Sequence, residues 1–438
     1  MSIATLGTAT ILLLFVLALA GAGLGALGAA RRSERLIEGG VQAVYATFAL
    51  AAFASSLIVY AFVAGDYSIQ YVQKTSDAAM PLFYKITAFW GGLDGSMLFW
   101  VLLHTLFASL AIRENRDRHR ELIPHVTAVL SVITAFFAGL LLFLKDPFSV
   151  YLLDVPTSGK GLNPLLQNLY MIVHPPSLYL GYVSLAVPYA FGMAALITGQ
   201  VDAAWQRSVR RWTLFSWMFL SIGLILGGLW AYEELGWGGY WAWDPVENAG
   251  LIPWFTVTAF LHSIMIQERR GMMKVWNVSL VIFSFVLTLV GTFMTRSGVV
   301  QSVHAFGADP ILAWTFGGFI LAVLLLSFAL VAWRLPLLRS RGELESVLSR
   351  EFAFLVNNWI FLVAAIFVLL ATLWPTFTEW RMILAERYPD LLGWQDPGQR
   401  VTIGPPFFNR YMRPLGLSLL LLTGVGPLLA WRKTSAQS

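Results

Sequence analysis

The chain has 438 residues, of which 58% are hydrophobic and only 12% are charged, and it contains no cysteine. A soluble domain of this size would carry about a quarter of charged residues, so the composition excludes an ordinary soluble protein. The lack of cysteine excludes thiol chemistry by the chain itself, and it excludes a c-type cytochrome, which needs a Cys-x-x-Cys-His site.

Apolar runs of membrane-spanning length recur along the whole chain. A bilayer core requires about 20 apolar residues per helix. Runs of roughly that length lie at 7–30, 41–64, 95–112, 123–144, 176–198, 212–231, 249–267, 275–294, 311–333, 353–374 and 414–431. The sequence therefore predicts an all-α membrane protein. We expect a polytopic bundle of about eleven transmembrane helices with short amphipathic periplasmic segments, forming one domain over residues 1–438.

Lysine and arginine set the expected orientation, because loops on the cytoplasmic side carry an excess of both. Alternate loops hold 19 of the 29 basic residues. They are Arg31, Arg32, Arg35, Arg113, Arg116, Arg118, Arg120, Arg207, Arg210, Arg211, Arg269, Arg270, Lys274, Arg334, Arg339, Arg341, Arg350, Arg432 and Lys433. These loops and the carboxy-terminal end are predicted to be cytoplasmic. The net charge of +5 thus reflects membrane topology and gives no indication of nucleic-acid binding.

The first run is predicted to be a retained helix, because no basic segment precedes it and Arg31 and Arg32 follow it. Further along, His104 and His125 fall at or within helices and are expected to be bundle residues. His119 lies among arginines and is expected to be solvated.

The fifth run opens with Val-His174-Pro-Pro-Ser, on the predicted outer side. Two prolines suit the start of a helix. We therefore expect His174 to lie just above that helix, in a constrained loop.

A tryptophan-rich segment follows the sixth run, within residues 230–254. It reads Trp230-Ala-Tyr-Glu-Glu-Leu-Gly-Trp237-Gly-Gly-Tyr-Trp241-Ala-Trp243-Asp244-Pro-Val-Glu247-Asn. An aromatic belt at the membrane interface is one interpretation. The concentration of rings beside Gly238 and Gly239 favours the other, a platform for a large planar apolar molecule.

Asp244-Pro-Val-Glu247 has the form of a capping box, with Asp at the N-cap and Pro at the first helical position. A helix-start role is thus expected for Asp244, with direct ligand contact as the alternative. His262 then falls deep within the seventh run. An ionisable residue inside a membrane span is a functional hypothesis by default, and a hydrogen-bonded packing histidine is its alternative.

The next outer loop contains Arg296 and His304, followed by Asp309-Pro310, which again predicts a cap and first helical turn. His174 and His304 both face outward and flank the tryptophan segment in the sequence. Two such histidines around an aromatic platform suggest axial ligation of a haem iron. Arg296 is a candidate partner for a haem propionate. After the tenth run, a long outer loop over roughly 375–413 mixes aromatic and charged residues, as a docking surface would.

The joint pattern resembles the CcmF-type cytochrome c haem lyases, a haem-handling group named for its tryptophan-rich "WWD" domain. The resemblance rests on Trp237-Gly-Gly-Tyr-Trp241-Ala-Trp243-Asp244-Pro, His174-Pro-Pro and Thr-Arg296-Ser-Gly-Val-Val-Gln-Ser-Val-His304. Further matches are Trp90-Gly-Gly-Leu-Asp-Gly-Ser, Asn357-Asn358 and Pro405-Pro-Phe-Phe-Asn409.

The resemblance implies that His174 and His304 hold substrate haem over a platform of Trp237, Trp241, Trp243 and Asp244. It implies that His262 is an axial ligand of a transmembrane haem b. The expected task is to receive haem from a periplasmic haem chaperone and join it to apocytochrome c, delivered by a carrier protein. The expected location is the bacterial inner membrane, with the tryptophan segment facing the periplasm and quinol as a candidate electron donor.

This sequence departs from the family pattern at two places. Leu93-Asp94 replaces the family's His-Glu, and no histidine follows His304, where the family has its second transmembrane haem ligand. Three other functions remain open on the residues: a haem lyase dedicated to a multihaem nitrite reductase, a haem exporter, and a membrane glycosyltransferase with a Trp-Trp-Asp segment.

Overall fold

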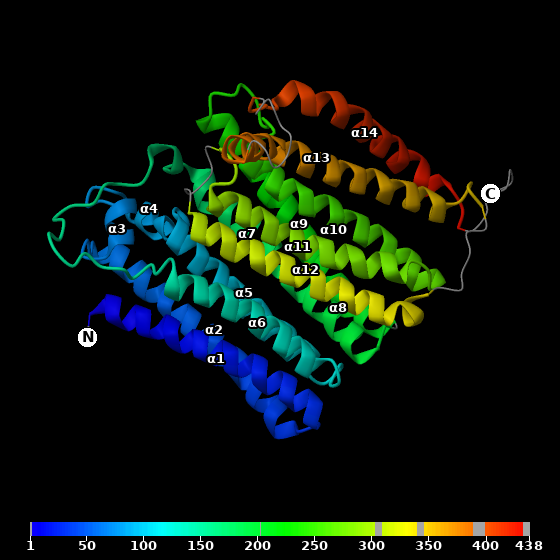
Figure 1. The fold of residues 1–438 in the computed structure, drawn as a ribbon, viewed down its shortest axis with the longest axis horizontal. Helices are drawn as coiled ribbons and strands as arrows, with labels where there is room; N and C mark the ends of the chain where they lie inside the picture. The colour runs from blue at the N-terminus through cyan, green and yellow to red at the C-terminus, as the bar shows by residue number, and fades with distance from the viewer. Residues whose placement is uncertain (1, 202, 303–308, 340–345, 389–398, 432–438) are drawn as a thin grey trace. The chain divides into compact units, whose positions relative to one another are not determined.

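The structure, a computed structural model, describes residues 2–201, 203–302, 309–339, 346–388 and 399–431. These residues form α-helices joined by loops and short 3-10 turns (Figure 1). They divide into two compact units. The first comprises Met1–Leu235 and Ala332–Leu337, and the second comprises Gly236–Val331 and Leu338–Ser438.

The first unit is built on long helices that pack side by side. Its long helices are α1 Ile3–Arg31, α2 Glu34–Ala64, α5 Leu93–Asn115, α6 Ile123–Phe143, α7 Leu169–Ser184, α8 Ala186–Thr198 and α9 Ala203–Glu234. α1 packs on α2 and α6, and α7 packs along α9. Small residues make this close packing feasible: a Cβ on Gly25 of α1 would lie 2.7 Å from the carbonyl oxygen of Pro124 on α6.

Short elements cover one end of this unit. They are α3 Gln70–Thr75, α4 Leu82–Thr87, η1 Ala88–Trp90 and η2 Pro164–Leu166. Ile69 and Val150 form an isolated antiparallel bridge that joins two of the connecting segments. This end corresponds to the predicted outer side, and its short helices fit the amphipathic segments expected there.

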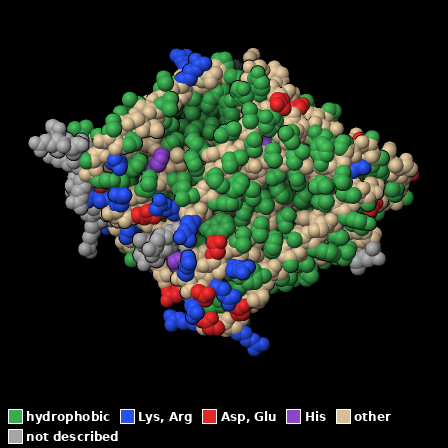
Figure 2. All heavy atoms as spheres, turned by 180° about the vertical axis from the view of Figure 1, so that it is seen from behind, with side chains coloured by type: hydrophobic (Ala, Val, Ile, Leu, Met, Phe, Trp, Pro, Cys, Tyr) green, Lys and Arg blue, Asp and Glu red, His purple; other side chains and the backbone are tan. Residues whose placement is uncertain are grey.

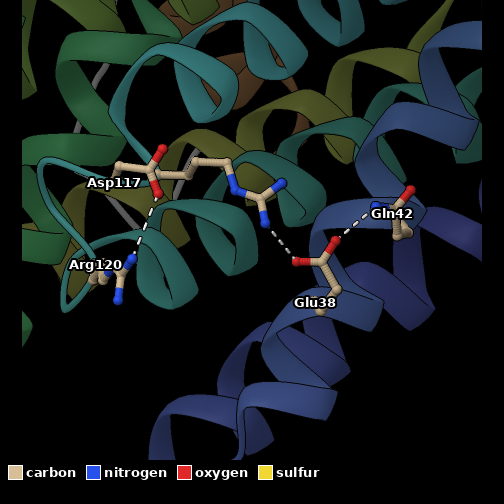
Figure 3. A network of polar contacts seen from close by, with 5 residues as sticks. Glu38, Gln42, Asp117 and Arg120 are labelled. Carbon is tan, nitrogen blue, oxygen red and sulfur yellow. Dashed lines mark hydrogen bonds and ion pairs between the residues drawn. The ribbon is translucent and has the colours of Figure 1, made fainter.

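An exposed polar network marks the opposite, predicted cytoplasmic side of the first unit (Figure 3). Arg116, after the end of α5, lies 2.9 Å from Glu38 of α2, and Glu38 accepts a 2.7 Å hydrogen bond from Gln42. Asp117 and Arg120 form a looser pair at 3.7 Å. Exposed pairs of this kind contribute at most about 1 kcal/mol, so the apolar helix packing carries the stability.

The second unit contains α10 Pro245–Arg270, α11 Lys274–Ser297, residues 310–331 of α12 Pro310–Leu338, α13 Arg350–Arg387, α14 Pro405–Val425 and η3 Gly426–Leu428. α10 packs against both α11 and α13, and α14 runs beside α13 (Figure 1). At one end of this packing, Arg270 of α10 lies 3.1 Å from Glu351 of α13, whose side chain is 1% exposed.

Many large apolar side chains point outward from these helices, as on α1 and α12, where Leu12, Trp314 and Leu325 are exposed. Apolar side chains cover large areas of the face drawn in Figure 2, and charged side chains gather in patches. Exposing so much apolar surface to water is unfavourable, whereas the hydrocarbon core of a bilayer accommodates it. The chain is a polytopic all-α membrane protein, as the sequence predicts.

Two predicted segments have different bounds in the structure. Ten described helices are long and apolar enough to cross a membrane, and the eleventh, expected at 414–431, is not among them. It corresponds to α14, which begins at Pro405 and carries Asn409, Arg410 and Arg413 in its first half. The expected long outer loop at 375–413 is also partly helical, because α13 continues through Pro375 to Arg387.

Candidate functional site

The tryptophan-rich segment links α9 to α10 and belongs, from Gly236 onward, to the second unit. Trp243, just before α10, has a φ of +58°. A residue with a side chain enters this left-handed region at a cost of about 1–3 kcal/mol, and only surrounding contacts can hold it there. Trp243 is therefore fixed by its neighbours rather than by its own backbone preference.

Those neighbours lie on α14 and α10. The indole Nε1 of Trp243 donates a 3.0 Å hydrogen bond to the side-chain oxygen of Asn409. The ring stacks on Phe408, with centroids 5.1 Å apart and planes 6° apart. The carbonyl of Trp243 accepts a 2.9 Å hydrogen bond from Asn248, which also reaches Thr372 on α13. Trp243 is thus a fixed anchor of the segment.

Trp237 and Trp241, the other two tryptophans of the candidate platform, are half-buried. Trp241 meets Trp243 edge to face, with centroids 5.9 Å apart, and its Nε1 has no hydrogen-bond partner among the described residues. Trp237 is partly exposed. A Cβ on Gly238 or Gly239 would meet no described atom within 4 Å, so the described residues leave open space beside these glycines. This arrangement can admit a flat ring system.

The capping box at the start of α10 is confirmed. Asp244 accepts from the backbone of Val246, and Glu247 accepts from the backbone N–H groups of Asp244 and Ala242. Ser302 also donates to the Asp244 carboxylate, at 2.6 Å. Asp244 therefore fixes the segment to α10, as the helix-start interpretation predicts.

An apolar hollow of about 480 Å³ lies in the same unit, lined mainly by α13 and the residues before α14, including Phe367, Trp374 and Phe407. Phe367 also contacts Phe408, the ring that supports Trp243, at 6.0 Å between centroids. The volume is within the range of small-molecule pockets, roughly 300–1,000 Å³.

His174 lies in the first unit, and its expected position in a loop above the helix is wrong. α7 begins at Leu169 and continues through Pro175 and Pro176, so His174 is a helical residue. Its Nδ1 lies 2.8 Å from the carbonyl oxygen of Gly223 on α9. An Nδ1–H donated to that carbonyl fixes the tautomer in which Nε2 carries the lone pair.

The space for this ring comes from a second glycine on α9. A Cβ on Gly227 would lie 2.6 Å from Cε1 of His174. Asn168, at the N-cap of α7, bonds the carboxylates of Glu233 and Glu234 at the end of α9. The start of α7 is thereby tied to α9 at Asn168 and again at His174.

His262 lies on α10, in the second unit, and is part-buried. Its Nδ1 lies 2.6 Å from Nδ2 of Asn357 on α13, and its ring stacks on Phe354 at 5.4 Å between centroids. Turning the amide over places its oxygen against Nδ1–H, which leaves the Nε2 lone pair for a metal. His262 and Asn357 together fit the role of a ligated and oriented histidine.

The remaining candidates are partly outside the described residues. His304 is one of them, since residues 303–308 are not described. Arg296 is a buried residue in the last turn of α11 and donates to Thr295 at 2.9 Å. Asp309 caps α12 by accepting from Ile311 and Leu312, as Asp309-Pro310 predicts.

His104 and His125 are helical, as expected. His104 is fully buried, and its Nε2 lies 3.1 Å from the carbonyl oxygen of Leu130.

Sequence reasoning missed the side chains that hold these candidates in place. Asn357 and Asn409 were visible only as motif matches without a role, and Gly223 and Gly227 were not singled out at all. Their partners lie far away in the sequence, or on another helix, so periodicity along one segment carries no signal for them.

Comparison with known proteins agrees with the sequence resemblance. A family model described as cytochrome C assembly protein matches residues 90–300. Cytochrome c-type biogenesis protein CcmF of Pseudomonas aeruginosa is 41% identical over 436 residues, which is 99% of this chain and 63% of that protein. The corresponding CcmF of Escherichia coli is 39% identical, covering 92% of this chain and 60% of that protein.

Two further similarities bear on the site. The probable cytochrome c-type biogenesis protein NrfE of Escherichia coli is 39% identical over 86% of this chain and 66% of that protein. A solved structure of the cytochrome c haem lyase CcmF aligns over the whole of this chain with a TM-score of 0.78 and 35% identity, and the alignment covers 64% of that chain. The chain thus spans about three fifths of the length of the CcmF relatives it matches.

Proposed function

This chain belongs to the CcmF-type family of cytochrome c assembly proteins, and on that premise we propose that it holds haem at its outer face and promotes haem attachment to apocytochrome c. The proposal rests on how two of the family's motifs are held in this structure. The tryptophan segment is anchored by Trp243 and has no described atom close to Gly238, and the His174 ring is oriented by the Gly223 carbonyl.

The proposed substrate haem is held by His174 and His304 and rests on Trp237 and Trp241. Each thiol of the apocytochrome's Cys-x-x-Cys-His site adds across a haem vinyl group, so that a carbon–sulfur bond forms and the thiol proton moves to the neighbouring carbon. The protein's task in this addition is to orient the haem edge and exclude competing nucleophiles. A chain without cysteine offers no thiol of its own to compete.

We assign His262 as a ligand of a transmembrane haem b, with Asn357 as the group that orients it. Such a haem, when bound, would supply electrons to keep the substrate iron reduced, with quinol as the candidate donor. The family's second ligand of this haem is a histidine beyond the position of His304. This sequence has no histidine there, so we assign no second axial ligand.

Two protein partners follow from the proposed task. A periplasmic haem chaperone would deliver haem, and apocytochrome c with its carrier would dock on the outer side. The proposed docking surface is the segment at 375–413, of which residues 389–398 lie outside the described residues, because its sequence mixes aromatic and charged residues. Photo-crosslinking from Arg387 should capture apocytochrome or its carrier, and capture of the haem chaperone alone would contradict this assignment.

The decisive experiment measures cytochrome c maturation in cells carrying His174→Ala, His304→Ala or both, with and without added imidazole. Each single change should lower maturation, imidazole should restore it by filling the vacated iron position, and the double change should abolish it. Full maturation in the double variant without imidazole would refute the proposal.

A parallel measurement separates the two haems. His262→Ala should remove haem b from the purified protein, as seen in its absorption spectrum, and Asn357→Leu should weaken haem binding by roughly 10- to 100-fold, the usual effect of removing a group that orients a metal-ligating histidine. Asn115→Leu is the matched control, because Asn115 is likewise a buried helical asparagine but lies on α5 in the first unit, where it donates to the carbonyl oxygen of Ala111 at 2.8 Å. Unchanged haem in His262→Ala would rule out this ligand.

The second candidate function is that of a haem lyase dedicated to a multihaem nitrite reductase. It stays open because this chain is about as similar to the probable cytochrome c-type biogenesis protein NrfE as it is to CcmF. Maturation of a monohaem and a multihaem cytochrome in the same cells distinguishes the two. A general haem lyase should mature both.

A further inference from the structure

The Trp90-Gly-Gly motif has no role in the function proposed above. Trp90 ends the short helix η1 in the first unit, and its Nε1 donates a 3.2 Å hydrogen bond to the carbonyl oxygen of Met171 in the first turn of α7. Met171 is three residues before His174, so the bond acts on the turn that carries that histidine.

The Met171 carbonyl needs this external donor because of the two prolines that follow it. In an α-helix the carbonyl of residue 171 accepts from the backbone N–H of residue 175, and here that residue is Pro175, which has none. Pro176 cannot donate either. Met171 is buried, and a buried carbonyl without a donor destabilises the fold. The indole N–H of Trp90 takes the place of the missing backbone donor.

Trp90 is itself held firmly in place. The N–H of Gly92 donates to the hydroxyl of Tyr71 at 3.0 Å, and that hydroxyl lies 3.0 Å from the carbonyl oxygens of Ala88 and Phe89. A Cβ on Gly92 would lie 2.8 Å from the Tyr71 ring, so this position requires glycine. Burial raises the pKa of Tyr71 well above its ordinary value, and the phenol stays a neutral donor and acceptor.

The indole ring also connects to α7 by packing. Trp90 contacts Phe99 on α5 at 5.4 Å between ring centroids, and Phe99 contacts Tyr179 on α7 at the same distance. The His174 ring has little room to move against α9, since its Nδ1 lies 2.8 Å from the Gly223 carbonyl oxygen and a Cβ on Gly227 would lie 2.6 Å from its Cε1. A shift of the first turn of α7 would therefore displace the His174 ring.

We propose that Trp90 is a positioning residue for His174, which it holds through the Met171 carbonyl that Pro175 leaves without a helical donor. The inference deepens the proposed function and rests on it, because it assigns the Trp-Gly-Gly motif to the histidine that holds substrate haem. Trp90 does not touch the haem in this assignment.

A double-mutant cycle between residues 90 and 175 tests the proposal. Trp90→Phe keeps an aromatic ring and removes the N–H, whereas Pro175→Ala restores the backbone donor to Met171. Hydrogen exchange of the amides of residues 170–174, in the full chain in detergent, should be about fivefold faster in Trp90→Phe, as expected for loss of one hydrogen bond. In the Trp90→Phe/Pro175→Ala double variant, exchange should return to within about twofold of Pro175→Ala alone.

Cytochrome c maturation should follow the same pattern, falling in Trp90→Phe and recovering in the double variant. Trp230→Phe is the matched control, because Trp230 also donates its indole N–H to a backbone carbonyl in the first unit, that of Leu165, at 3.0 Å. The effect of Trp230→Phe on maturation and on amide exchange should be the same whether proline or alanine occupies position 175.

Two results would overturn the inference: unchanged exchange in Trp90→Phe, or an equal effect of that change whether proline or alanine occupies position 175. Failure of the proposed function gives a different result. In that case the exchange cycle would show the coupling while His174→Ala alone matured cytochrome c fully.

Discussion

The position of the His174 ring depends on glycine at position 227. A Cβ added to Gly227 would lie 2.6 Å from Cε1 of His174, and the ring's Nδ1 is fixed by the carbonyl of Gly223. Packed interiors do not adjust to a contact this short without moving a side chain. The ring is the group that must move, since the Gly227 backbone belongs to the long helix α9.

Gly227→Ala should therefore displace the His174 ring and lower cytochrome c maturation toward the level of His174→Ala. Overpacking of this kind typically costs about 1–3 kcal/mol of stability, so the amount of folded protein in the membrane must be measured beside the activity. Gly317→Ala on α12 is the control, because its Cβ would meet no described atom within 4 Å. Wild-type maturation in Gly227→Ala would show that the His174 ring is not confined by α9.

At the scale of helices, α14 holds Trp243 of the tryptophan segment in place. Apart from Phe408 and Gly426 just after it, most residues of α14 are exposed or half-exposed. Its main structural contribution is the Phe408 ring under Trp243 and the Asn409 oxygen on the Trp243 indole. The Pro-Phe-Phe-Asn match is thus explained by a contact between residues 166 positions apart in the sequence.

Asn409→Leu should release the Trp243 indole and reduce haem holding, whereas Asn409→Asp keeps an oxygen acceptor and should retain most of it. The hydrogen bond is expected to be worth about 1 kcal/mol, so the effect on maturation should be partial. Equal behaviour of the two variants would indicate that the stacked Phe408 alone fixes Trp243.

Ion pairs on two pairs of helices should differ sharply in strength. Arg270 and Glu351 join α10 to α13 with side chains 16% and 1% exposed, whereas Arg116 and Glu38 are both exposed (Figure 3). Arg270→Met leaves a buried carboxylate without its partner arginine and should lower the free energy of unfolding by about 3 kcal/mol or more. Arg116→Met should cost less than about 1 kcal/mol. Denaturation in detergent micelles measures both, and similar losses would contradict the role of burial.

For the whole molecule, membrane orientation is the property on which the proposed chemistry depends. The alternation of arginine-rich loops predicts that Gly239 faces the periplasm and Asp117 the cytoplasm. Alkaline phosphatase, which is active only outside, should be active when fused after Gly239 and inactive after Asp117. A reporter active only in the cytoplasm should give the reverse pattern, and activity of that reporter at Gly239 would invert the topology.

The sequence by itself determined the class of the protein and its local helix starts. Long apolar runs specify membrane helices because each span must satisfy its backbone hydrogen bonds internally, whatever its neighbours are. The caps at Asp244 and Asp309 were predictable for a similar reason, since each involves side chains and backbone groups within a few residues.

Only the tertiary structure decided how the candidate residues are held. The helical position of His174 contradicts the local preference of two prolines, because Trp90 on another element supplies the donor that Pro175 lacks. The contacts of Trp243 with Asn409 and of His262 with Asn357 likewise join distant segments. Such contacts depend on which helices pack together, and periodicity within one helix does not encode its partner.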